Sequence, residues 1–282
     1  MKKELDITND NIVKIFFQYA IPTILGMVAI SSASIVDGIF VGQYIGANAL
    51  AVINLTVPYV SVLLGLVMML GAGGCVFCGK LMGEKNINAA SATFSRILII
   101  MAVLIFFIWI IVLVFTDQLA YILGADDNIL DELVTYLINY TYFLPFQLLG
   151  IGISYFARVN GRPGLTSFAL LFSAIMNVVL DCVFVILLEL GIKGAAFATG
   201  ISQSMTFFLL FPTFIGKRSR LKLTKPAKFS RDILYSIFNG ASEFLNETSS
   251  GIIAFAFNHV LMRQAGVDGV AAFTTINFFL IQ

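Results

Sequence analysis

Apolar residues fill long stretches of this chain, and short polar segments separate them. Seven stretches are complete and an eighth begins near Gly269; the seven cover residues 14–41, 48–78, 92–116, 131–157, 164–189, 194–215 and 233–262. A stretch of about 20 apolar residues is long enough to cross a bilayer. Because hydrocarbon offers no water to backbone groups, such spans form α-helices. The pattern predicts an all-α membrane protein.

The composition of the chain supports this class. Hydrophobic residues make up 59% and charged residues 12% of the 282 positions, whereas a soluble domain carries about 25% charged residues. The net charge of +1 gives no global basic field, so we expect no nucleic-acid partner. The sequence stops at FTTINFFLIQ inside the eighth span. We therefore expect a fragment, or one half of a larger bundle.

Loop charges orient the spans. The loops after the second, fourth and sixth spans are basic, and the segment 216–232 holds seven Lys or Arg against one Asp. The loop after the third span is acidic, with Asp117, Asp126 and Asp127. By the positive-inside rule the N-terminus is cytoplasmic in a multi-pass protein of the cell (inner or plasma) membrane. We interpret 216–232 as a cytoplasmic linker between two bundles rather than as a lipid or nucleic-acid patch.

An internal repeat supports two bundles. The chain reads QYIGANALAVINL after the first span and RQAGVDGVAAFTTI after the seventh, so that Gly46 aligns with Gly266. Six spans separate the copies, which predicts a parallel repeat. The predicted fold is a complete N-terminal six-helix bundle (1–215), the linker, and the first one to two helices of a second, parallel-repeat bundle (233–282).

Two carboxylates lie inside the spans, Asp37 in the first and Asp181 in the fifth. An acid at the centre of a membrane helix costs about 2.5–3.5 kcal/mol on insertion scales and usually serves a function. With a rise of about 1.5 Å per residue, the predicted orientation places both acids in the outer half of the membrane. Tyr136 and Thr199 fall at the same depth. Asn177 shares a helix face with Asp181, because four residues separate them.

These side chains would form an oxygen-rich pocket. Carboxylate, amide and hydroxyl oxygens suit a hard cation such as Na⁺. Alternatively, two neighbouring carboxylates in a low dielectric cannot both ionise cheaply, so one would hold a proton. Separate helix–helix hydrogen bonds are the ordinary role of single polar residues in a membrane, but two acids at one depth favour a functional site.

An enzymatic role is not expected. The acidic run DDNILD at 126–131 resembles the motif with which membrane prenyltransferases hold Mg²⁺-diphosphate, yet no second acidic motif accompanies it and this one maps outside. Cys75 and Cys78 have redox or metal spacing but no second pair or histidine nearby. We expect no cofactor beyond a coupling ion, Na⁺ or H⁺.

The chain resembles the MATE family, the multidrug and toxic compound extrusion transporters. The matching elements, in order, are a proline-containing first helix, VDGIFVG, ARVNGRPG, NVVLD in the fifth helix and GAAFATG in the sixth. The resemblance implies two six-helix bundles that face each other across a central cleft, which opens alternately outward and inward. It also implies a chain truncated after the start of the eighth transmembrane helix.

The resemblance also implies site residues. Positions that match the family's cation site, as Na⁺ or proton ligands, are Asp37, Asn177, Asp181 and Thr199, with Tyr136 as their hydrogen-bonding neighbour. In some members an embedded acid of the seventh helix takes part in coupling, so Glu247 is a further candidate.

The sequence therefore predicts a secondary antiporter that exports amphipathic or cationic drugs or toxic compounds in exchange for Na⁺ or H⁺. Its expected partners are a small-molecule substrate and membrane lipid, and the full-length protein is expected to be a monomer. One alternative is a lipid-linked saccharide flippase of the related superfamily, which would line its cleft with cationic residues, whereas Lys and Arg here concentrate in loops. Another is a non-functional truncated half-transporter.

Overall fold

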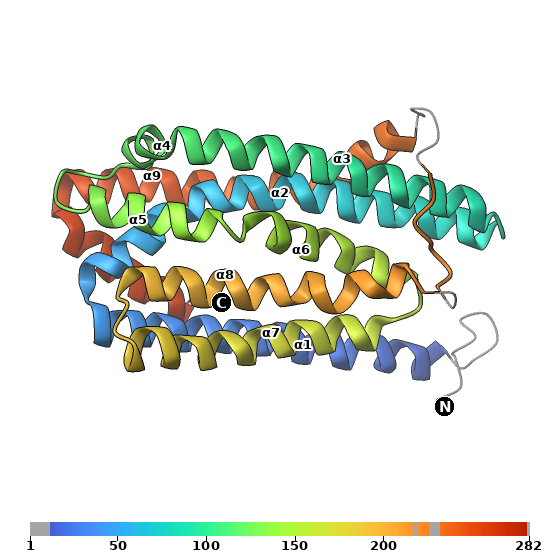
Figure 1. The fold of residues 1–282 in the computed structure, drawn as a ribbon, viewed down its shortest axis with the longest axis horizontal. Helices are drawn as coiled ribbons and strands as arrows, with labels where there is room; N and C mark the ends of the chain where they lie inside the picture. Colours follow the sequence, from blue (N-terminus) through green and yellow to red (C-terminus); the bar gives the residue numbers. More distant parts are fainter. Residues whose placement is uncertain (1–11, 217–218, 226–231, 281–282) are drawn as a thin grey trace.

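Long helices running side by side form the computed structural model, which describes residues 12–216, 219–225 and 232–280 (Figure 1). No strand occurs in these ranges, so the predicted all-α fold is confirmed. The elements are α1 (Ile12–Phe40), η1 (Val41–Ile45), α2 (Ala47–Gly83), α3 (Ile87–Val114), α4 (Thr116–Leu123), α5 (Leu130–Thr141), α6 (Leu144–Val159), α7 (Pro163–Asp181), η2 (Cys182–Leu187), α8 (Ile192–Leu210), η3 (Phe211–Phe214) and α9 (Asp232–Leu280).

Most of the helices follow the predicted spans, and the fourth span is the main exception. Five segments of the described chain are long and apolar enough to cross a membrane: Ile24–Ile45, Ala47–Gly83, Ile87–Val114, Pro163–Leu187 and Ile192–Phe214. The third span begins earlier than predicted, because the Asn86 side chain caps α3 by accepting a hydrogen bond from the Ala89 N–H. The acidic segment between the third and fourth predicted spans contains most of the short helix α4 (Thr116–Leu123).

The basic connections all lie at one end of the bundle. The turns from α2 to α3 and from α6 to α7, and the segment after α8, lie on the right in Figure 1. The turn from α1 to α2, the acidic segment before α5 and the turn from α7 to α8 lie on the left. This separation of charge is the one from which the orientation was predicted. We call these the basic end and the acidic end.

The fourth predicted span, 131–157, is two helices and not one. In a continuous helix the carbonyl of Thr141 would accept a hydrogen bond from residue 145, but Pro145 has no N–H. The chain turns at Tyr142 and Phe143, and the indole N–H of Trp109 on α3 donates to the Thr141 carbonyl at 2.9 Å. A side chain of a neighbouring helix thus satisfies the carbonyl that proline leaves free.

This contact predicts a measurable stability difference. In Trp109→Phe the Thr141 carbonyl loses its donor inside the membrane, so we expect a loss of about 1 kcal/mol of unfolding free energy. Thermal unfolding in detergent measures it, with the lipid-exposed substitution Phe107→Leu as the matched control on the same helix. Equal stability of Trp109→Phe and Phe107→Leu would contradict the assigned role.

The first part of the linker is docked on the bundle. The Asn160 side-chain oxygen accepts hydrogen bonds from the N–H groups of Arg220 (3.0 Å) and Leu221 (2.9 Å), and the Leu221 side chain is fully buried. The hydroxyl of Ser95 on α3 accepts from the Thr224 N–H at 2.9 Å. Residues 217–218 and 226–231 of the predicted linker lie outside the described residues. The division of the chain at 215 and 233 stays a prediction.

Both copies of the proposed repeat have a glycine with a positive φ at the aligned position. Gly46, between η1 and α2, has φ +121°, and Gly266, which kinks α9, has φ +64°. Both are left-handed values that favour glycine. Ala51 and Ala271, which align in the two copies, are both buried. The eighth helix therefore begins just after Gly266, slightly before the predicted Gly269.

α9 lies along α2 with its backbone in close approach. A Cβ atom on Gly73 of α2 would overlap the carbonyl oxygen of Ser236, and one on Gly240 of α9 would overlap that of Met69. Further along the pair, the Asn258 side chain donates to the Asn54 carbonyl at 3.1 Å. Small residues let membrane helices approach this closely, and we call this contact the α2–α9 seam.

Candidate functional site

The two acids predicted from the sequence lie together. α1 and α7 run side by side (blue and yellow in Figure 1), with Asp37 near the end of α1 and Asp181 as the last residue of α7. Their carboxyl groups lie close enough to influence each other electrostatically. The Asp181 side chain is fully buried, and neither its oxygens nor Oδ1 of Asp37 have a hydrogen-bond partner in the described chain. Two such carboxylates need a proton or a cation between them.

A wide, π-type turn follows each acid. After Asp37, the N–H of Gly46 donates to the Val41 carbonyl five residues earlier, at 3.0 Å. After Asp181, the N–H of Leu188 donates to the Val183 carbonyl, again five residues earlier, at 2.9 Å. Turns of this kind are rare and often accompany functional sites. Both acids therefore precede a local departure from the α-helix.

Tyrosines extend from the acid pair towards α2. Tyr136 is buried and lies within electrostatic reach of both carboxyl groups. Its ring stacks on that of Tyr140, one helical turn later, with 5.8 Å between centroids. Tyr140 in turn lies near Tyr59 of α2. Tyr136 thus lies near the acid pair, and its role as a hydrogen-bonding neighbour stays a prediction.

The two remaining predicted ligands are less closely associated with the pair. Asn177 lies one turn before Asp181 on α7 and lines a cavity. Thr199 lies half-buried on α8, and its backbone carbonyl accepts from the Ser202 hydroxyl at 3.0 Å. In the described residues no hydrogen bond joins either side chain to a carboxylate. Their assignment as ligands stays a prediction.

The cavity beside the acids is about 230 Å³ in volume and lies between α1, α2, α5, α6, α7 and α8. Most of its walls are apolar, and none of the described residues that line it is an Asp, Glu, Lys or Arg. The Ser173 hydroxyl in its wall donates to the Ser202 carbonyl at 2.7 Å. The polar groups at its surface include Tyr140, Gln147, Ser173, Asn177, Gln203 and Thr206.

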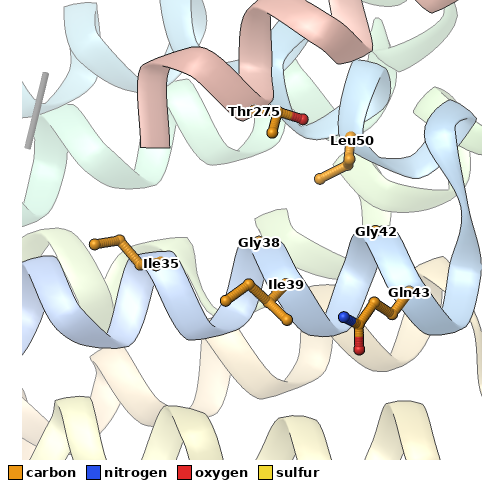
Figure 2. A pocket seen from close by; sticks show the side chains of 7 residues that line it. All are labelled: Ile35, Gly38, Ile39, Gly42, Gln43, Leu50 and Thr275. Carbon is orange, nitrogen blue, oxygen red and sulfur yellow. The ribbon is translucent and has the colours of Figure 1, made fainter. Parts of the chain in front are cut away.

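A second hollow of about 200 Å³ lies on the opposite side of α1 (Figure 2). In it, Gly38 of α1 and Gly42 of η1 lie across from Thr275, which belongs to the last part of α9. Gln43 is the other polar side chain in its wall. The end of α1 that carries Asp37 is therefore placed between α7 on one side and α9 on the other.

Glu247 does not join the acid pair. It lies half-buried on α9, where it and Glu243 are within electrostatic reach of Tyr155 on α6. The guanidinium of Arg158 lies 5.6 Å from the centre of the Tyr155 ring. In the described part of the chain no three His, Cys, Asp or Glu side chains form a metal-type cluster. The role of Glu247 in coupling stays a prediction.

A comparison with known protein families identifies the family of this chain. A family model described as MatE matches residues 22–183, which include Asp37, Tyr136, Asn177 and Asp181. The chain belongs to the MatE family. The family predicted from the sequence motifs is therefore confirmed, and with the apolar helices it makes the chain a multi-pass membrane protein.

Similar proteins extend the family assignment. The multidrug export protein MepA of Staphylococcus haemolyticus is 28% identical over 276 residues, which are 96% of this MatE chain and 60% of the relative. MepA of Staphylococcus aureus strain MSSA476 is 27% identical over 275 residues, again 60% of its length. This chain thus spans about 60% of the length of the curated relatives it matches.

Solved structures share the fold. An inward-facing multidrug resistance MATE family transporter of the MOP superfamily superposes with a TM-score of 0.76 and 27% identity, over 86% of this chain and 56% of that one. The MATE multidrug transporter DinF-BH, solved as a complex, has a TM-score of 0.89 over the whole of this chain and 64% of its own, at 23% identity. The second likeness shows the fold alone.

Sequence reasoning missed the cavity and the two wide turns. The cavity had a signal, because Ser173 and Asn177 are spaced four apart on α7, and Ser202 and Thr206 are spaced four apart on α8. Two adjacent spans with such polar pairs predict polar groups facing each other. The wide turns had no signal in the residue pattern.

Proposed function

We propose that this chain carries the ion-coupling site of a secondary antiporter that exports amphipathic, often cationic compounds in exchange for Na⁺ or H⁺. Membership of the MatE family and the names of the relatives, multidrug export proteins, support the transport class. The full-length protein would act as a monomer in the cell membrane with its N-terminus in the cytoplasm.

The observation that carries the proposal is the unpartnered pair of Asp37 and Asp181. Deep between α1 and α7, this pair has no protein donor in the described residues and no basic side chain beside it. Binding one proton or one Na⁺ cancels part of the repulsion between the carboxylates. The pair thus has the chemistry of an ion-binding site, and its occupancy would depend on the ion gradient.

Coupling would act through α1. The end of α1 lies between α7, which carries the other acid, and α9, which faces it across the second hollow (Figure 2). An ion that draws Asp37 towards Asp181 changes how this end of α1 meets α9. A ligand shifts a conformational equilibrium by its differential affinity for the two states. The substrate and the ion would therefore compete by favouring different positions of α1.

The flippase alternative finds no support at the cavity. A protein that grips a diphosphate needs cationic side chains, because Arg and Lys are the usual phosphate binders. The cavity next to the acids is lined by apolar residues, hydroxyls and amides. These walls suit part of an amphipathic compound better. At about 230 Å³, the cavity is smaller than the roughly 300–1,000 Å³ of drug-sized pockets, so a whole substrate requires a wider state.

Transport by the full-length protein in vesicles tests the proposal. With a fluorescent amphipathic cation as the substrate, and with Na⁺ and pH gradients imposed separately, we expect one of the two gradients to drive substrate movement. A response to Na⁺ alone assigns Na⁺, and a response to pH alone assigns H⁺. Substrate movement that depends on neither gradient would exclude ion-driven antiport.

A further inference from the structure

Tyr140 lies between the acid pair and the cavity beside it. It belongs to the last turn of α5, four residues after Tyr136, so the two side chains share a face of the helix. Their rings stack with 5.8 Å between centroids and an angle of 11° between their planes. Tyr136 lies within electrostatic reach of both carboxyl groups, and Tyr140 lines the cavity. One pair of rings therefore connects the surroundings of the acids to the cavity wall.

Dense packing couples the positions of the two rings. Tyr136 is 4% exposed and Tyr140 is 6% exposed, so other side chains surround both rings, and protein interiors contain few voids. Stacked rings at this distance contact each other over their faces. A rotation of the Tyr136 ring would therefore shift the Tyr140 ring and change the shape of the cavity.

The backbone next to Tyr140 is held by two neighbouring helices. The Trp109 indole on α3 donates to the carbonyl of Thr141, the next residue along the chain. The ring of Phe143 packs so closely on α8 that a Cβ atom on Gly200 would overlap it. Because these contacts hold the backbone, a rotation of the side chain is the movement that remains for Tyr140.

α1 and α7 also extend from the acids to the cavity. Ser34 lies three residues before Asp37, Asn177 lies four residues before Asp181, and both Ser34 and Asn177 line the cavity. These two connections run along the helices that carry the acids, whereas the stacked tyrosines belong to α5. The connection through the tyrosines can therefore be removed without a change in either helix that carries an acid.

We propose that Tyr140 is a positioning residue, which transmits ion binding at the acid pair to the substrate in the cavity through its stack on Tyr136. An ion between the carboxyl groups changes the surroundings of Tyr136, and the Tyr140 ring then changes the space that the cavity offers to a substrate. Because coupling between two binding sites is reciprocal, a substrate that displaces the Tyr140 ring weakens ion binding by the same factor. This inference rests on the proposed function, because it requires both an ion and a substrate.

Equilibrium binding to the purified full-length protein tests this role. Ethidium, a fluorescent amphipathic cation, is titrated in detergent, with Na⁺ varied at a fixed pH and with pH varied at a fixed Na⁺ concentration. The coupling factor is the ratio of the Kd values for ethidium with and without the bound ion. For the wild type we expect a factor of at least about five, the lower end of typical couplings between sites. Tyr140→Leu keeps an apolar side chain but loses the flat ring, so we expect it to reduce the factor at least about threefold.

Two control variants should keep the wild-type coupling factor. Tyr140→Phe retains the ring and therefore the stack, and Tyr142→Leu makes the leucine substitution at a neighbouring tyrosine that is 53% exposed. Tyr140→Met is a second variant without the ring, because a flexible methionine fills irregular space if Tyr140→Leu does not fold. If Tyr140 only supported the fold, its loss would change the melting temperature and both Kd values for ethidium, but not their ratio.

The possible outcomes separate this inference from the proposed function. A wild-type coupling factor of 1 for both Na⁺ and H⁺ would contradict the proposed function and, with it, the role of Tyr140. A wild-type factor that persists in Tyr140→Leu and Tyr140→Met would overturn the role of Tyr140 alone and would assign the coupling to α1 and α7. An equal loss of coupling in Tyr140→Phe would assign the effect to the hydroxyl and would overturn transmission through the stacked rings.

Discussion

We expect asparagine in place of either Asp37 or Asp181 in the full-length protein to abolish ion-driven efflux, while the yield and membrane insertion of the protein stay at the wild-type level. Asparagine keeps the shape and an oxygen of each side chain but can carry neither the charge nor the proton. The unpartnered carboxylates are costly to bury, so we also expect Asp181→Asn to melt no earlier than the wild type. Loss of transport without loss of stability separates a coupling role from a structural one.

Asp131→Asn is the matched control for both variants. This acid lies in the first turn of α5 at the acidic end of the bundle, but its side chain is exposed, so its neutralisation should leave efflux intact. The measurement is the initial rate of substrate movement under the driving gradient, normalised to the amount of protein in the vesicles. Wild-type rates in both Asp37→Asn and Asp181→Asn would rule out coupling by the pair.

The second large effect is expected at the α2–α9 seam. In Gly73→Ala the new methyl group overlaps the Ser236 carbonyl, and in Gly240→Ala it overlaps the Met69 carbonyl. Backbone atoms cannot turn aside as a side chain can, so α2 and α9 must separate. Overpacking of this kind costs about 1–3 kcal/mol and occasionally more. We expect a clearly lower melting temperature and an increased fraction of aggregated protein.

Gly79 supplies the control on the same helix. It lies six residues after Gly73 on α2, and a Cβ atom there would meet nothing within 4 Å. Alanine favours a helix over glycine by about 1 kcal/mol, so Gly79→Ala should be neutral or stabilising. Gly73→Ala and Gly79→Ala make the same chemical change, so the difference between their melting temperatures measures the effect of the α2–α9 seam alone. Equal melting temperatures of Gly73→Ala and Gly79→Ala would contradict the close approach.

The sequence predicted the features that follow from distance along a helix. Asp37 and Asp181 were placed together by counting residues from the charged loops, and they interact in the structure. The repeat that pairs Gly46 with Gly266 was predicted from a short sequence alignment, and both glycines have a positive φ. Depth and period depend only on the helical rise, which hardly varies between helices.

Features that depend on which side chains meet could not be predicted. Asn177 shares a face with Asp181 yet lines the cavity, because rotation and tilt of α7 decide where each group points. The partner of the Thr141 carbonyl is Trp109, which lies 32 residues away in the sequence, and no local sequence pattern predicts that pairing. The α2–α9 seam also depends on glycines in two distant segments. Crossing angles decide such contacts, and a hydrophobic pattern does not encode them.

The wide turns after the two acids have a consequence for helix register. Each holds one residue more than an α-helix would place in the same turn. If the extra residue moved by one position along the chain, the peptide group that it passes would rotate about the helix axis. The rotation would be about 100°, which is the angle between successive residues of an α-helix. A helix that contains such a turn can present a different side to its neighbours without breaking its remaining hydrogen bonds. The two turns, η1 and η2, follow α1 and α7 at the same end of the bundle.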